Sequence, residues 1–163
     1  MDLHDNEGVL LINLGSPKEL NKKSVKEYLR VFLSDDNVLD IPKFFQQLIL
    51  RLFILPFRPK NTLEAYEKIW TKNGSPLIIS TQSIANKLTK KTGWQVEYAM
   101  RYEEPSIEKA LSNFKKKGIN KILCSMLSRG CEGFNNFEFS EFIYSHGAEL
   151  NQEIMEAGIL ISL

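Results

Sequence analysis

The sequence predicts an α/β fold, with an open, mostly parallel sheet that carries helices on both faces. Three short apolar runs indicate strands, at residues 8–15, 95–100 and 120–126. Segments with helical periodicity lie between them, and each is long enough to cross over to a parallel strand. Because such folds bind ligands at the carboxyl ends of their strands, residues that directly follow a predicted strand are the first candidates for a site.

The first predicted strand, "GVLLINLG", is a continuous apolar run that ends in the turn "GSP". The apolar positions of residues 25–33 then recur at i, i+3, i+4, i+7 and i+8, which is the stripe of an amphipathic helix. The polar residues 34–37 predict the end of that helix.

Residues 44–59, "FFQQLILRLFILPFRP", form an unusually apolar stretch. Its contiguous apolar part is well short of the roughly 20 residues that a helix needs to cross a bilayer, so we expect no membrane span. Pro56 and Pro59 predict that any helix in this stretch ends before them. On its own, the pattern is typical of a buried core helix.

The remaining elements alternate between helix and strand. "NTLEAYEKIW" is helical in composition, "TKNGSP" indicates a turn, and "LIISTQSIANKLTKK" has a second helical stripe. "QVEYAM" alternates like a strand, and "NKILCSM" begins another. Between these two strands, "PSIEKALSNFKKKG" places four apolar residues on one helix face.

Composition excludes several classes of function. The 21 basic and 20 acidic residues give a formal charge of +1, whereas nucleic-acid binding needs a concentrated basic excess, so we expect no nucleic-acid partner. The start of the chain lacks the pattern of a secretory signal, which predicts a cytoplasmic location. Cys124 and Cys131 match neither a redox nor a zinc motif, and we expect reduced thiols. With neither a Walker loop nor a GxGxxG fingerprint, no nucleotide cofactor is indicated.

Three further segments occur in a specific order and spacing: "LLINLGSP", "LPFRPKNTLEAYEKIWTKNGSPL" and "YAMRYEEPSIEKAL". Together they resemble the ferrochelatases, which insert iron into a porphyrin at the end of haem synthesis. The resemblance extends over about residues 8–123. It implies a chelatase-like, Rossmann-like α/β half, which we place at residues 1–123, with porphyrin and Fe²⁺ as substrates and no permanently bound cofactor.

The resemblance also implies a set of porphyrin-binding residues, namely Leu14, Arg58, Tyr66, Ser75, Arg101 and Tyr102. Leu14 matches a position that packs on the macrocycle, and a guanidinium such as that of Arg58 pairs bidentately with carboxylates. Arg101 and Tyr102 follow a predicted strand, where an α/β fold places its ligands. By residue type alone, Arg58 also suits a plain surface position, Tyr66 core packing and Ser75 a turn.

In ferrochelatases, the segment that corresponds to residues 44–57 forms a hydrophobic lip beside the porphyrin cleft and in some members touches a membrane. A mixture of phenylalanine, leucine and isoleucine with Arg51 suits a surface that lies on lipid or closes over a ring. The resemblance therefore implies peripheral contact with a membrane as well as a porphyrin partner.

The family's proton-accepting and iron-handling groups are a His and a Glu from the second half of a chain about twice this long. Neither can be assigned here, because His4 lies near the start of the chain and His146 comes too early. We therefore predict no catalytic residue, no metal ligand and no chelatase turnover by this chain. The acidic residues around His146 are interpreted as an exposed helix face; they are Glu141, Glu149, Glu153 and Glu156.

After Leu123 the sequence departs from the family pattern. Codons permitted for "CSMLSRGCEGFNN", read one nucleotide later, can encode the family's Tyr-Pro and later Ser-Thr, so we hypothesise a truncating frame shift that leaves residues 124–163 as a tail outside the family. A short protein with its own C-terminal segment is the alternative. Two other functions stay open, a non-catalytic porphyrin- or haem-binding half-domain and a peripheral membrane-contact protein.

Overall fold

The computed structural model describes residues 6–35, 38, 41–127 and 153–156. The chain divides into two compact units. One, the sheet unit, combines Met1–Leu14 with Ser80–Leu163, and the other, the helical unit, comprises Gly15–Ile79. The predicted tail lies mostly outside the described residues, and its origin stays a prediction.

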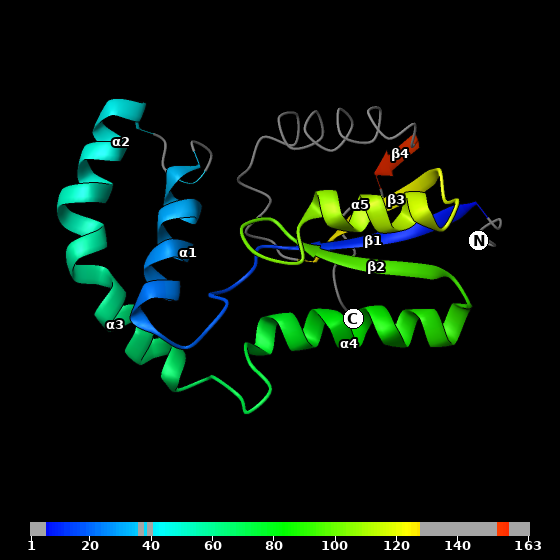
Figure 1. Ribbon diagram of the computed structural model, residues 1–163, viewed down its shortest axis with the longest axis horizontal. Helices are drawn as coiled ribbons and strands as arrows, with labels where there is room; N and C mark the ends of the chain where they lie inside the picture. Colours follow the sequence, from blue (N-terminus) through cyan, green and yellow to red (C-terminus); the bar gives the residue numbers. More distant parts are fainter. Residues whose placement is uncertain (1–5, 36–37, 39–40, 128–152, 157–163) are drawn as a thin grey trace. The chain divides into compact units, whose positions relative to one another are not determined.

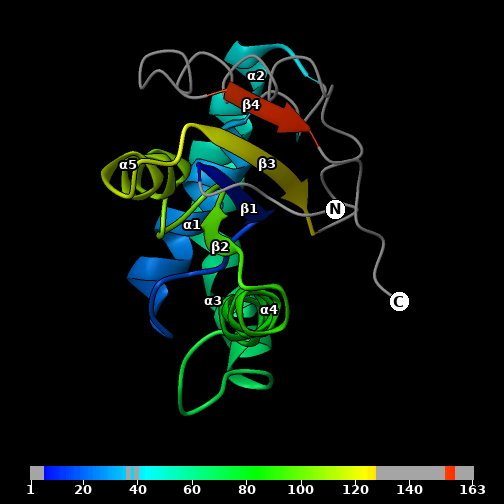
Figure 2. The same cartoon turned by 90° about the vertical axis from the view of Figure 1, so that its right-hand side faces the viewer.

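The sheet unit contains four parallel strands in the order β2-β1-β3-β4, as Figure 2 shows. Their bounds are Glu7–Asn13 for β1, Gln95–Met100 for β2, Lys121–Met126 for β3 and Glu153–Glu156 for β4. In register, Val9 lies between Val96 of β2 and Leu123 of β3. All three predicted strands and the parallel α/β architecture are confirmed.

Strand β4 corrects one expectation, since Glu153–Glu156 belong to the segment interpreted as an exposed helix face. The backbone of this segment instead pairs with β3, in the register Lys121↔Glu153 to Cys124↔Glu156. Hydrogen bonding to a sheet edge here outweighs the weak local preference of an acidic sequence.

Helices cover both faces of the sheet (Figure 1). Helix α5 (Ile107–Lys116) packs on one face, where Phe114 and Leu111 are fully buried against Leu10 and Ile12. The strand and helix approach so closely that a Cβ at Gly8 would lie 2.7 Å from Phe114 Cε1. On the other face, residues of α4 (Pro76–Thr92) pack against β1 in a cluster with these members: Val9, Leu11, Ala85, Leu88, Val96 and Leu123.

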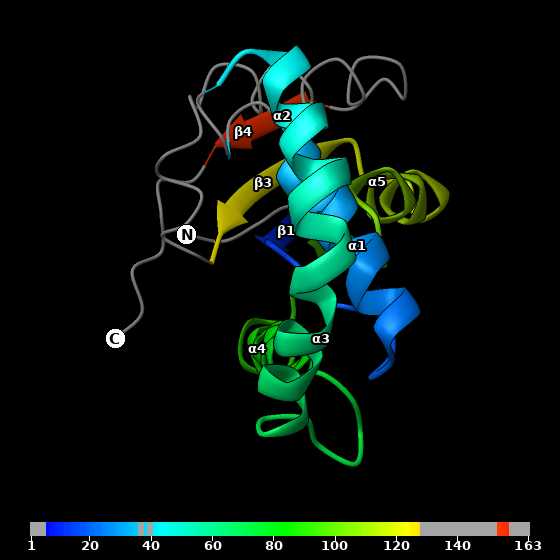
Figure 3. The ribbon, with the colours of Figure 1, turned by 90° about the vertical axis from the view of Figure 1, so that its left-hand side faces the viewer.

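The helical unit contains α1 (Lys22–Ser34) and a continuous helical run formed by α2 (Lys43–Ile49), the π-helix η1 (Leu50–Ile54) and α3 (Leu55–Glu67). Asn21 caps α1, because its side chain accepts a hydrogen bond from the Ser24 N–H at 2.8 Å. The run lies alongside α1 (Figure 3), and the core between them consists of Val25, Leu29, Leu33, Leu50 and Leu55. The predicted stripe of α1 is confirmed.

The prediction that Pro56 and Pro59 end the helix is wrong. Pro56 lies in the first turn of α3, directly after η1, in which the Leu55 N–H donates to the carbonyl of Leu50 five residues back, whereas Pro59 lies inside α3. Proline is tolerated in the first turn of an α-helix, where a missing N–H leaves no carbonyl without its donor. The change from π to α hydrogen bonding therefore lets the helix continue through Pro56, and α3 also continues through Pro59 to Glu67.

Candidate functional site

The carboxyl ends of β1 and β2 bring three of the predicted site residues together. The Tyr102 N–H donates to the carbonyl of Leu14 at 3.0 Å, and the Arg101 N–H donates to the carbonyl of Asn13 at 2.9 Å. The segments that follow β1 and β2 thus stay hydrogen-bonded to each other beyond the end of the sheet, at the edge where this class of fold binds ligands. Leu14 and Arg101 are half-buried and Tyr102 is buried.

Arg101 and Tyr102 also contact each other through their side chains. The guanidinium carbon of Arg101 lies 5.4 Å from the centroid of the Tyr102 ring, within the range of a cation–π contact. This contact orients a permanent positive charge beside the ring of Tyr102, whose backbone N–H pairs with the carbonyl of the apolar Leu14. A flat apolar ligand with carboxylates on its rim suits those groups.

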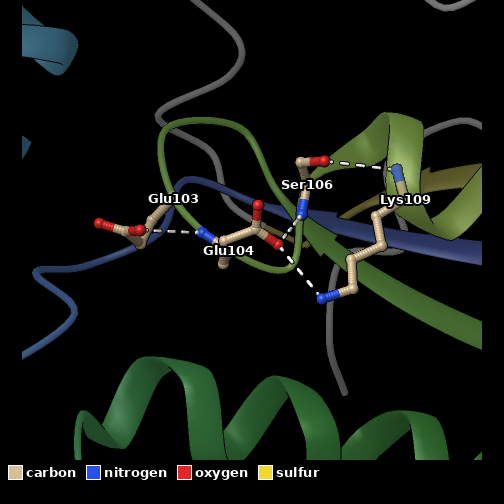
Figure 4. A network of polar contacts seen from close by, with 4 residues as sticks. All are labelled: Glu103, Glu104, Ser106 and Lys109. Carbon is tan, nitrogen blue, oxygen red and sulfur yellow. Dashed lines mark hydrogen bonds and ion pairs between the residues drawn. The ribbon is translucent and has the colours of Figure 1, made fainter.

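The loop after β2 is fixed by a small polar network, seen in Figure 4. The Ser106 N–H donates to the carboxylate of Glu104 at 3.2 Å, and the Lys109 ammonium lies 3.7 Å from the same carboxylate. Ser106 caps α5 by accepting from the Lys109 N–H at 3.3 Å. Because the Met100 N–H also donates to the carbonyl of Pro105 at 2.8 Å, the loop that carries Arg101 and Tyr102 is anchored at both ends.

Two buried residues that the sequence analysis missed complete this edge. The side-chain oxygen of Asn13 accepts from the Leu14 N–H at 2.9 Å, and its Nδ2 donates to Thr81 Oγ1 of α4 at 3.0 Å. Asn13 is 6% exposed and Thr81 is 1% exposed. The one signal in the sequence is that a polar residue ends an otherwise apolar strand.

The other predicted site residues belong to the helical unit. Arg58 on α3 is exposed, and no described residue forms an ion pair with it. Tyr66 on the same helix is half-buried against the core of the unit and makes an edge-on contact with Trp70, with 5.9 Å between ring centroids. Burial raises the pKa of Tyr66 above its ordinary value.

Ser75 is 4% exposed and lies between a tight turn and α4. In the turn, Thr71 and Gly74 exchange backbone hydrogen bonds of 3.1 Å, and Gly74 has a φ of 111°, which favours glycine. The carbonyl of Ser75 accepts from the Ile79 N–H at 3.1 Å at the start of α4. The predicted turn at residues 71–76 is confirmed, and Ser75 occupies the place that the turn interpretation expects.

The predicted lip segment presents a row of exposed apolar side chains, which we call the apolar strip. Its members are between 38% and 74% exposed: Phe44, Phe45, Leu48, Ile49, Leu52, Phe53 and Phe57. Leu50 and Leu55 of the same run point into the core instead. The interpretation of this segment as a buried core helix is therefore wrong for the strip. None of the described helices is both long enough and apolar enough to cross a membrane.

The part of the chain that the structure describes contains no cluster of metal-binding side chains. No group of three or more His, Cys, Asp or Glu residues there could hold a metal ion. Cys124 is a buried cysteine of β3. His4, His146 and Cys131 lie outside the described residues.

Comparison with known proteins identifies the family. The family model for ferrochelatase matches residues 6–129, a range that contains all six predicted site residues. This chain belongs to the ferrochelatase family. The match covers the three segments on which the resemblance rests and agrees closely with the expected range of residues 8–123.

Individual relatives agree. The chain is 41% identical over 138 residues to the ferrochelatase of Pseudoalteromonas atlantica, an alignment that covers 81% of this chain and 38% of the relative. It is 40% identical over 123 residues to that of Francisella tularensis subsp. holarctica, which covers 74% and 37%. For Idiomarina loihiensis, the values are 42% over 125 residues, 73% and 34%. The chain thus spans little more than a third of each relative's length.

Proposed function

We propose that this ferrochelatase-family chain binds a porphyrin and supplies substrate-binding residues for the insertion of Fe²⁺. The convergence of Leu14, Arg101 and Tyr102 at the carboxyl ends of β1 and β2 carries the proposal. Leu14 offers an apolar contact for the macrocycle, while Arg101 offers a cation for a propionate. The coproporphyrin or protoporphyrin ring and the iron are both substrates.

We also propose three porphyrin-contacting residues on the helical unit itself. Arg58 is exposed and has no described ion-pair partner, so its guanidinium is available to a propionate. Tyr66 and Ser75 each carry a hydroxyl that can donate a hydrogen bond to a carboxylate. Their half-buried and buried positions favour a well-fixed contact over a mobile one.

We further propose that residues 1–163 bind porphyrin without inserting iron. The family resemblance assigns the proton-accepting His and the Glu to a second half of the enzyme, and the chain spans at most 38% of the relatives compared above. Porphyrin binding requires only apolar walls and cationic donors, whereas metal insertion also requires a base for two pyrrole protons.

Titration with protoporphyrin and with coproporphyrin, followed at the Soret band, tests the binding proposal. Arg58→Ala and Tyr66→Ala should each weaken binding, whereas Arg30→Ala should not. Arg30 is an exposed arginine on α1 that pairs with Glu27, which makes it a matched control. If the Soret band of the porphyrin stays unchanged over the whole titration, the proposal is contradicted. Formation of iron porphyrin under anaerobic conditions with Fe²⁺ contradicts the absence of insertion.

A second function is favoured by a separate observation, the apolar strip. Seven exposed apolar side chains on one helical run exceed what a surface facing only water needs. We propose that the strip lies on the surface of a membrane, with the exposed Arg51, which lies between Ile49 and Leu52 in the sequence, meeting lipid head groups. Sedimentation with lipid vesicles tests this function independently of porphyrin binding.

A further inference from the structure

Asn13 forms hydrogen bonds to three other residues at the carboxyl ends of the strands of the sheet unit, namely Leu14, Thr81 and Arg101. Its backbone carbonyl accepts from the Arg101 N–H at 2.9 Å, and its side-chain oxygen accepts from the Leu14 N–H at 2.9 Å. Its side-chain nitrogen donates to Thr81 Oγ1 at 3.0 Å. One side chain and its own peptide thus connect β1, the loop after β2 and helix α4.

The orientation of the Asn13 amide follows from its partners. A backbone N–H only donates, so the group that faces Leu14 must be the oxygen, and the nitrogen therefore faces Thr81. Thr81 Oγ1 is the acceptor that holds the amide in this orientation. Both side chains are more than nine-tenths buried, so water competes little for these hydrogen bonds.

Leu14 is fixed on both sides as a result. Its N–H donates to the Asn13 side chain, and its carbonyl accepts from the Tyr102 N–H at 3.0 Å. The peptide of a residue that follows the end of a strand is ordinarily free to turn, but here both of its polar groups have partners. The side chain of Leu14 remains half-buried, so the residue is held rigidly while part of it stays accessible.

We propose that Asn13, held by Thr81, is a positioning residue that sets the place of Leu14 and Arg101 for porphyrin binding. The inference rests on the proposed function, since it concerns the affinity of that same site. Asn13 acts through its neighbours and needs no contact with the ligand. Its role depends on the acceptor at position 81, which can be removed without touching any predicted porphyrin-binding residue.

Thr81→Val tests the inference, because valine keeps the shape of threonine and removes the acceptor. Leaving the buried Asn13 N–H without that acceptor should weaken protoporphyrin binding by about five- to tenfold. Thr81→Ser keeps the acceptor and should bind within about twofold of the unaltered chain. Thr89→Val is the matched control, since the Thr89 hydroxyl donates to the Ala85 carbonyl of the same helix at 3.1 Å.

Two readouts separate positioning from general stability. The dissociation constant for protoporphyrin, measured on folded protein, should change only for Thr81→Val. Hydrogen exchange of the Leu14 amide, measured without porphyrin, should quicken in that variant and stay unchanged in the Thr89→Val chain. A purely structural role would lower the melting temperature of both valine variants and leave the dissociation constant of the folded chain unaltered.

The inference is overturned if Thr81→Val binds like the unaltered chain, or if both valine variants lose affinity equally. Should Thr81→Val fail to fold, Thr81→Ser decides, because loss of binding in a folded chain that retains the acceptor contradicts the mechanism. Failure of the unaltered chain to bind porphyrin refutes the proposed function instead. In that case, Leu14 exchange still shows whether Asn13 holds this edge.

Discussion

Replacing Phe44 and Phe53 by serine should remove most of the chain's affinity for lipid vesicles. These two side chains of the apolar strip are 74% and 63% exposed, so they contribute little to the core of the helical unit. Substitutions at such exposed positions rarely change the free energy of unfolding by more than about 0.5 kcal/mol. A loss of vesicle binding would therefore report on the surface and not on the fold.

The expected size of the effect follows from the exposed fractions. Full burial of a phenylalanine side chain is worth about 1.5–3 kcal/mol. Scaled by the exposed fractions of 74% and 63%, the two side chains together contribute about 2–4 kcal/mol when they enter the head-group region. Since each 1.4 kcal/mol is a factor of ten, the partition constant should fall by about 30- to 700-fold.

The assay is sedimentation with phosphatidylcholine vesicles, with and without a fifth of anionic lipid. Because the expected loss comes from apolar contact, its size should be nearly the same at low and at high salt. Anionic lipid should strengthen binding of both chains alike, since Arg51 and Arg58 are retained.

The matched control is Ile69→Ser with Ile84→Ser. These side chains are 55% and 45% exposed and lie outside the apolar strip. The control chain should sediment like the unaltered one. If the phenylalanine variant still sediments fully, or if the control loses as much binding, the strip is not the lipid contact.

Three further predictions concern stability. Gly8→Ala should destabilise the fold by about 1–3 kcal/mol, because its Cβ would meet the buried ring of Phe114, and thermal unfolding would show this as a melting temperature lowered by several degrees. Asn21→Ala should cost about 1 kcal/mol in chemical denaturation, since α1 loses its cap. Burial raises the pKa of Tyr66, so the folded state resists its ionisation; the stability from this group is present below pH 10 and is lost as the pH rises above it. An ultraviolet titration in which Tyr66 ionises like an exposed tyrosine, identified by comparison with Tyr66→Phe, would contradict that prediction.

The parts of the fold that could be predicted are those with a local period. The continuous run of β1 and the stripes of α1 and α5 are each fixed by side chains a few positions apart, and all three were confirmed. The proline prediction failed because helix continuity at Pro56 depends on the hydrogen-bond register that η1 sets upstream. Strand β4 was missed because a partner strand more than 25 positions earlier along the chain creates it.

The candidate site likewise has one part that the sequence could predict and one part that depends on residues far apart in the chain. Residue type and family resemblance single out Leu14, Arg101 and Tyr102, and their approach could be expected because parallel strands end at one edge. The hydrogen bond between Asn13 and Thr81 joins residues 68 positions apart, and neither residue type announces a function. Such a buried polar pair becomes visible only when the fold brings its members into contact.

The helical run offers an argument about the apolar strip that exposure alone does not. On α2 the polar Gln46 is buried, at 1% exposed, while Phe44 and Phe45 face outward. The side-chain nitrogen of Gln46 donates to the carbonyls of Leu33 and Asp35, at 3.1 Å each. These carbonyls lie at the end of α1, where no further backbone N–H of the helix is available to them. The inner face of α2 therefore carries a polar side chain that hydrogen-bonds to the end of α1. The phenylalanines Phe44 and Phe45 on the outer face are not buried within the unit, so its core does not explain why they are apolar. A helix with a polar residue on its inner face and apolar residues on its outer face is expected where the outer face contacts an apolar environment. The membrane contact proposed above would supply such an environment.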